Sequence, residues 1–184
     1  MPVDKNIYDA IIVEAADRYQ NNPRILKSIV QVESYFRPRA YRYEPALFKR
    51  LKEKDPFWAD KDPSIVSASY GLCQVLFSTA WAMERPADWN TMNHARFQQY
   101  AEGLYEPRVS LDLGSRLLRA LLDKVWADKL PEKFEDLSAM EIALARYNGG
   151  SYKNPDEDGV LDEQKYVDKV FRAFAEIKPL RRAI

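Results

Sequence analysis

The chain has 184 residues, of which 46% are hydrophobic and 30% charged, the balance expected of one globular domain spanning residues 1–184. Basic and acidic side chains both number 28, and this zero net charge argues against a nucleic-acid-binding protein, which needs a basic surface. The single cysteine excludes an intramolecular disulfide, and no apolar run approaches the ~20 residues that span a membrane.

Two helices are predicted at the start of the chain from apolar residues three and four positions apart. Residues 8–19 form one amphipathic stripe, which ends at Asn21-Asn22-Pro23. A second helix is expected to begin at Pro23, because proline suits the first turn of a helix, and to end near Ser34–Arg37, before Pro38.

Glu33 occupies an unusual place in this second helix. Ile25, Ile29 and Glu33 are four residues apart, so the carboxyl group ends an apolar stripe. Burial there would raise its pKa and keep a proton available for general acid catalysis. The pattern is equally compatible with an alternative, in which Glu33 lies at a frayed helix end in water.

The segment from residue 37 to residue 70 is rich in proline and aromatic residues. A short helix is expected over residues 46–54, and the remainder is predicted to be a structured loop region. Long loops inside compact domains are often functional. The aromatic rings either stack on sugar rings or simply fill the core.

The rest of the chain is predicted to be helical, and strand signals are weak throughout. Ser78 is the expected N-cap of one helix, Gly103 the expected C-cap of another, and Ser138 with Glu141 forms a capping box. The predicted helices cover residues 78–83, 93–102, 110–128, 138–147 and 161–178. The expected fold is a compact, mainly α domain of several helices.

Several kinds of chemistry are disfavoured by composition. His94 and Cys73 are the only residues of their types, too few for an ordinary zinc site, and no G-x-S-x-G nucleophile elbow occurs. Cys73 is interpreted as a core residue and His94 as an exposed one. We therefore expect neither metal nor cofactor, and carboxylates remain as the catalytic candidates.

Four segments, in order, resemble the catalytic domain of the soluble lytic transglycosylases within the lysozyme-like superfamily. The resemblance covers roughly residues 20 to 175. The segments are Glu33-Ser34-Tyr35-Phe36, similar to E-S-x-F; Tyr70-Gly71-Leu72-Cys73-Gln74-Val75, similar to G-L-M-Q; Ala143 to Gly150, similar to A-L-x-A-Y-N-x-G; and Tyr166-Val167-Asp168-Lys169-Val170, similar to Y-x-x-K-V.

This resemblance implies a lysozyme-like fold and cleavage of the β-1,4 bond between N-acetylmuramic acid and N-acetylglucosamine in peptidoglycan. Glu33 would protonate the leaving oxygen and then, as a base, take the proton of the C6 hydroxyl. Ring closure would give a 1,6-anhydro product without consuming water. In the family's usual account the substrate's own N-acetyl group stabilises the cation, so one carboxylate suffices where ordinary glycosidases use two.

The resemblance also implies the residues that bind substrate around Glu33. Tyr147 would orient the Glu33 carboxyl, and Tyr166 would approach the catalytic acid or the N-acetyl pocket. Gln74 and Asn148 would hold sugar amides or shape the groove, although Asn148 is equally well explained as a helix C-cap. Ser34 belongs to the first motif, and the family's serine near the cleaved bond corresponds to Ser69 or Ser67.

The sequence departs from the family pattern at Cys73, Arg146 and Leu111, and Gln74 lies 41 positions after Glu33, further than in the simplest members. This long insertion contains Glu44. If Glu44 held a water across from Glu33, the enzyme would be a hydrolytic, inverting muramidase. The preferred interpretation is that Glu44 pairs with Arg42 or Arg39, or orders the inserted loop. A non-catalytic wall-binding module is a weaker alternative.

The expected partner is the glycan strand of peptidoglycan, with no nucleic acid, no stable membrane insertion and a monomeric state. The first residues lack the apolar core of a secretory signal. A phage endolysin or virion-associated enzyme is therefore the preferred setting, and the mature form of a periplasmic protein is the alternative.

Overall fold

A computed structural model describes residues 4–84, 93–128, 137–149 and 164–180. These residues are mainly helical, as predicted. The chain divides into two compact units, and each is built from separate stretches of sequence. Unit 1 comprises Met1–Asn6 and Glu33–Leu113, and unit 2 comprises Ile7–Val32 and Gly114–Ile184.

Unit 1 contains a small antiparallel sheet that the sequence analysis missed. Its strands are β1 (Tyr41–Tyr43), β2 (Ala68–Tyr70) and β3 (Val75–Leu76), in the order β1-β2-β3. Arg42 pairs with Ser69 across the first two strands. Strands of two or three residues are too short to show a period of two, which explains why the pattern did not reveal them.

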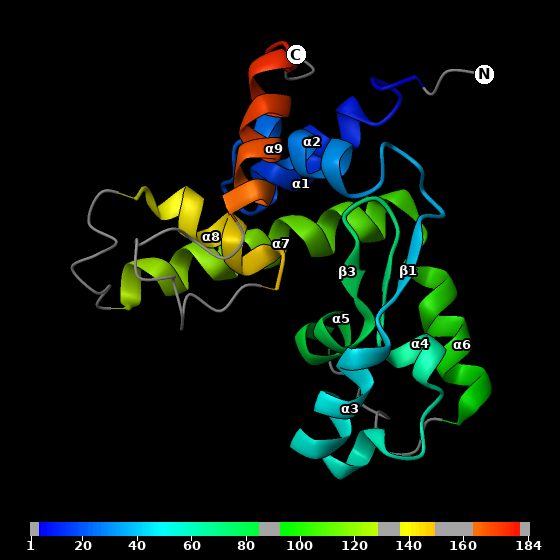
Figure 1. Cartoon of the computed structure of the whole chain (residues 1–184). Coiled ribbons are helices and arrows are strands. Elements are labelled where there is room, and N and C mark those ends of the chain that lie inside the picture. The colour runs from blue at the N-terminus through cyan, green and yellow to red at the C-terminus, as the bar shows by residue number, and fades with distance from the viewer. Residues whose placement is uncertain (1–3, 85–92, 129–136, 150–163, 181–184) are drawn as a thin grey trace. The chain divides into compact units, whose positions relative to one another are not determined.

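The helices of unit 1 gather toward one end of this sheet (Figure 1). They are α3 (Pro45–Lys54), the 3-10 helix η1 (Pro56–Trp58), α4 (Pro63–Val66), α5 (Phe77–Glu84) and α6 (His94–Gly103). The segment from residue 37 to residue 70 is thus more regular than its composition indicates. Three of its four prolines, Pro45, Pro56 and Pro63, begin helices, at a position where the missing N–H costs nothing.

Two predicted helix caps in unit 1, Ser78 and Gly103, are wrong by one or two residues. Helix α5 begins at Phe77, so Ser78 lies inside it. Helix α6 continues through Gly103 and is capped by Leu104, whereas its N-cap is Asn93, which accepts a hydrogen bond from the Arg96 N–H. Boundaries of this kind depend on local hydrogen bonds that spacing alone does not specify.

Aromatic rings form much of the core of unit 1, but most of these rings lie outside the segment from residue 37 to residue 70. Within that segment Trp58 is buried, whereas Tyr41 and Tyr43 are exposed, so core filling does not explain all of its rings. The rings of Trp81 and Phe97 stack with centroids 4.8 Å apart, and Phe77 stacks on Phe97 at 5.7 Å. All three side chains are almost fully buried.

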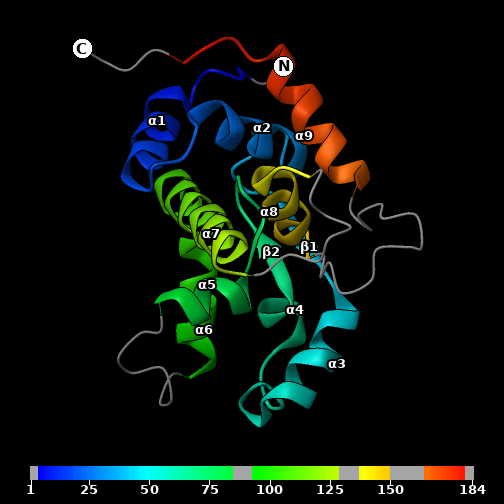
Figure 2. The same cartoon turned by 90° about the vertical axis from the view of Figure 1, so that its left-hand side faces the viewer.

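Unit 2 is helical in the residues that the structure describes, and Figure 2 shows its helices in a view turned by 90° from that of Figure 1. They are α1 (Asp9–Arg18), α2 (Pro23–Glu33), α7 (Pro107–Ala127), α8 (Ala139–Tyr147) and α9 (Gln164–Glu176). Glu33 and the residues of α7 up to Leu113 belong to unit 1. The helices of unit 2 bury one hydrophobic core, which includes Ile25, Ile29, Leu118, Leu122, Val125, Ile142, Leu144, Val167 and Val170. Residues 161–163 of the predicted last helix, and Gly150 of the third motif, lie outside the described residues.

The predicted capping box at the start of α8 is confirmed and gives a first testable prediction. Ser138 Oγ accepts from the Glu141 N–H, and Glu141 Oε2 accepts from the Ser138 N–H at 2.7 Å. Replacing Ser138 with Ala should lower the free energy of unfolding by about 1 kcal/mol, because helix N–H groups lose their partner. Ser138→Thr is the matched control, since its hydroxyl preserves the cap. Equal stability of both variants in urea denaturation would contradict this account.

Candidate active site

Glu33 is the last residue of α2, and its side chain is only 5% exposed. The preceding turns of the helix bury Ile25, Leu26, Ile29 and Val30, as the apolar stripe predicts. The alternative of a frayed, solvated end is therefore wrong. A carboxyl group removed from water is costly to ionise, which suits a group that must donate a proton.

The chain reverses direction immediately after Glu33 through a tight turn. Tyr35 and Phe36 both adopt left-handed backbone conformations, with φ of 53° and 61°. Each such residue costs about 1–2 kcal/mol when it carries a side chain. The backbone N–H and the Nε of Arg37 both donate to the Ser34 carbonyl oxygen at 3.1 Å and close the turn. Ser34 itself is 1% exposed.

Gln74 connects the residue that precedes β1, Ala40, to the sheet. Its Nε2 donates to the carbonyl oxygens of Ala40 and Gly71, both at 3.0 Å, and its Oε1 accepts from Ser69 Oγ at 3.0 Å. Both amide hydrogens are therefore used within the protein. This arrangement supports groove shaping, rather than sugar binding, as the role of Gln74. The Gln74 backbone is also left-handed, with φ of 47°.

The structure distinguishes the two candidate serines. Ser67 Oγ donates to the Pro63 carbonyl oxygen at 2.6 Å, within the turn of α4. Ser69 lies on β2, is fully buried, and holds the Gln74 amide. Of the two, Ser69 is the one that belongs to the network around Gln74.

Arg42 lies between the two carboxylates that the sequence analysis singled out. Its Nε donates to Glu44 Oε1 at 3.1 Å, and its Nη1 lies 4.0 Å from Glu33 Oε2. The prediction that Glu44 pairs with Arg42 is confirmed. Arg39 pairs instead with Glu102, at 3.0 Å.

These residues surround an open groove of about 640 Å³ in unit 1. That volume is in the usual range for a site binding a small molecule or a few sugar units. The groove is lined by Glu33, Arg37, Pro38, Arg39, Ala40, Tyr41, Arg42 and Gln74. Glu33 and Gln74 were predicted site residues, whereas the three arginines were not. Their clustering within residues 37–42, shortly after the candidate acid Glu33, was the signal that could have identified them.

Tyr147, Asn148 and Tyr166 belong to unit 2. Tyr147 is the last residue of α8, and Asn148 is the C-cap, whose N–H donates to the Leu144 carbonyl oxygen at 3.2 Å. Tyr166 is 7% exposed in the core of this unit. The capping role of Asn148 is thus confirmed, and the roles of all three residues toward Glu33 stay predictions.

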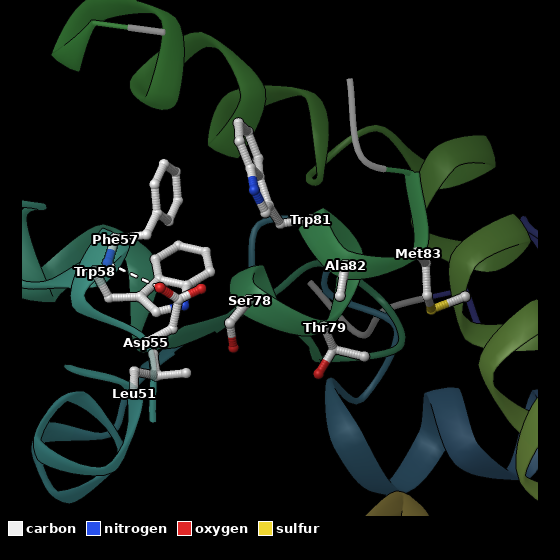
Figure 3. Close-up of a pocket in the computed structure, with 9 residues that line it drawn as sticks. All are labelled: Leu51, Asp55, Phe57, Trp58, Ser78, Thr79, Trp81, Ala82 and Met83. Carbon is white, nitrogen blue, oxygen red and sulfur yellow. Dashed lines mark hydrogen bonds between the residues drawn. The ribbon is translucent and has the colours of Figure 1, made fainter. Parts of the chain in front are cut away.

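A second hollow, of about 530 Å³, lies among α3, η1 and α5 in unit 1 (Figure 3). The rings of Phe57, Trp58 and Trp81 gather on one side of it. Trp58 and Trp81 are only 8% and 4% exposed, and Asp55 accepts a hydrogen bond from the Phe57 N–H. The rings of Phe57 and Trp58 contact that of Trp81, with centroids 6.3 and 6.5 Å apart, and so pack this part of the insertion against α5.

The other chemistries considered from sequence have little support within the described residues. Cys73 is fully buried, as expected of a core residue, and His94 is exposed. No group of three or more potential metal-binding side chains occurs in the described part of the chain.

No helix among the described residues is both long and apolar enough to cross a bilayer.

A mainly helical chain with a buried glutamic acid at a helix end, opening on a groove, has the features of a lysozyme-like protein. Comparison with known families agrees: the model of the transglycosylase SLT domain matches residues 10–160, a range that covers parts of both units. The chain therefore belongs to the transglycosylase SLT domain family. No curated protein and no solved structure matched it. Membership supports, at the level of the family, a lytic transglycosylase that acts on peptidoglycan.

Proposed function

We propose that this protein cleaves the β-1,4 bond between N-acetylmuramic acid and N-acetylglucosamine and leaves a 1,6-anhydro-muramoyl end. The observation that carries the proposal is the Glu33 carboxyl group, 5% exposed and facing an open groove. Membership of the transglycosylase SLT family supplies the substrate class.

In the proposed reaction Glu33 acts twice. Its proton moves to the glycosidic oxygen as the bond from that oxygen to C1 of the muramoyl sugar breaks. The C6 hydroxyl oxygen then bonds to C1, and its proton returns to Glu33. No water is consumed, and the carboxyl group ends as it began. The attacking hydroxyl is tethered to the same sugar, so little entropy is lost in bringing it to C1.

The contacts of Glu44 support a mechanism with a single catalytic carboxylate. Its Oε1 accepts a hydrogen bond from Arg42, and Arg42 is in turn near Glu33. This places a guanidinium between the two acids, where an inverting hydrolase would need a water poised by the second carboxylate. We assign Glu44 a positioning role through Arg42.

Mass spectrometry of digested peptidoglycan tests this proposal. We expect muropeptides that end in 1,6-anhydro-muramic acid, which are lighter by one water than the products of hydrolysis. Glu44→Gln should leave the type of product unchanged, since the amide oxygen can still accept from Arg42. Products with reducing muramic ends would instead establish a hydrolytic muramidase. Absence of any product at nanomolar to micromolar protein would favour a wall-binding module.

A further inference from the structure

The three arginines of the groove differ in how their charges are compensated. Arg39 is paired with Glu102 at 3.0 Å, and its guanidinium lies 4.5 Å from the centre of the Tyr105 ring. Arg42 is paired with Glu44. Arg37 is exposed, and among the residues that the structure describes it has no carboxylate partner. If Glu33 is protonated, as the proposed reaction requires, the groove keeps one uncompensated positive charge at Arg37.

The guanidinium of Arg37 is also held in place before any ligand arrives. Its Nε donates to the Ser34 carbonyl oxygen at 3.1 Å, and the same oxygen accepts from the Arg37 backbone N–H. Tyr35 and Phe36, which lie between Ser34 and Arg37, have left-handed backbone conformations that keep this turn tight. The two Nη groups make no hydrogen bond to another described residue, so the planar guanidinium can still use them to bind the two oxygens of a carboxylate.

We propose that Arg37 binds a carboxylate of the peptide carried by the muramoyl sugar. This inference rests on the proposed function, because the peptide is attached to the sugar whose bond is cleaved. Arg37 follows Glu33 by one tight turn and lines the same groove. A single uncompensated arginine suits one carboxylate, whereas a doubly charged phosphate is usually held by several donors. The enzyme would therefore act preferentially on glycan strands that still carry acidic peptides.

The test compares peptidoglycan with its peptide carboxylates intact and the same material with those carboxylates converted to amides. Amidation removes charge while keeping the peptide and the glycan. For the wild-type protein we expect kcat/KM to be about 10- to 100-fold higher on the intact material, the usual size of a charge-assisted hydrogen-bonded pair. Arg37→Gln should bring this ratio close to one. Arg50→Gln, an exposed arginine on α3 outside the groove, should keep the wild-type ratio.

The outcomes separate this inference from the proposed function. A wild-type ratio near one, or an unchanged ratio in Arg37→Gln, would overturn the role of Arg37 while leaving the reaction intact. An equal loss of activity on both materials in Arg37→Gln would assign the side chain to the turn alone and also overturn it. Failure of the wild-type protein to release anhydro products from either material would instead remove the proposed function.

Discussion

Replacing Glu33 with Gln should lower turnover on peptidoglycan by about 10²–10⁴-fold, the usual contribution of a general acid. Glutamine has nearly the same shape and can occupy the buried position, but it has no proton to give the leaving oxygen. The unfolding midpoint should stay close to that of the wild-type protein. In the proposed reaction the buried Glu33 side chain, 5% exposed, begins protonated and neutral, and glutamine is neutral too. Release of soluble muropeptides and urea denaturation measure the two effects.

Glu44→Gln is the matched control for this experiment. It removes a second carboxylate that shares the same arginine, Arg42, and it makes an identical chemical change. We expect its turnover to stay within about tenfold of the wild-type value, consistent with a positioning role for Glu44. Appreciable activity in Glu33→Gln would refute the assigned role of Glu33. A comparable loss in both variants would show that two carboxylates take part.

Replacing Gly71 with Ala is expected to have the largest effect on stability. A β-carbon at this position would lie 2.5 Å from the Leu104 carbonyl oxygen and 2.6 Å from Ser110 Oγ. Gly71 also has a φ of +73°, which disfavours any side chain. The strain and the steric overlap together should lower the free energy of unfolding by about 2–5 kcal/mol. That is a large fraction of the ~5–15 kcal/mol that stabilises a typical domain.

The same substitution at Gly103 provides the control. This glycine lies at the end of α6, and a β-carbon there would meet no atom within 4 Å. Gly103→Ala should be neutral or stabilising by up to about 1 kcal/mol, because alanine is the better helix former. Because the Gly71 carbonyl oxygen accepts from Gln74, we also expect Gly71→Ala to reduce activity in the protein that still folds. Similar stability of the two variants would show that the backbone around Gly71 and Leu104 can move apart at little cost in free energy.

The helices of this protein could be predicted well because each carries its own signal. The stripe in residues 23–33, the apolar repeat of α7 and the capping box at Ser138 all appear within a few consecutive residues. The short strands could not be predicted, because their pairing joins residues far apart in sequence, such as Arg42 and Ser69. The prolines of the insertion were ambiguous, since a proline marks either a loop or the first turn of a helix.

By itself the sequence determined the family, the helical class and the identity of the candidate acid. Family motifs and helical periodicity are local properties, so a single chain is enough to recognise them. Only the tertiary structure decided that Glu33 is buried, that Arg42 rather than Arg39 pairs with Glu44, and that Gln74 is used in holding the groove together. These features depend on which distant residues meet and on how much water they exclude, and spacing along the chain specifies neither.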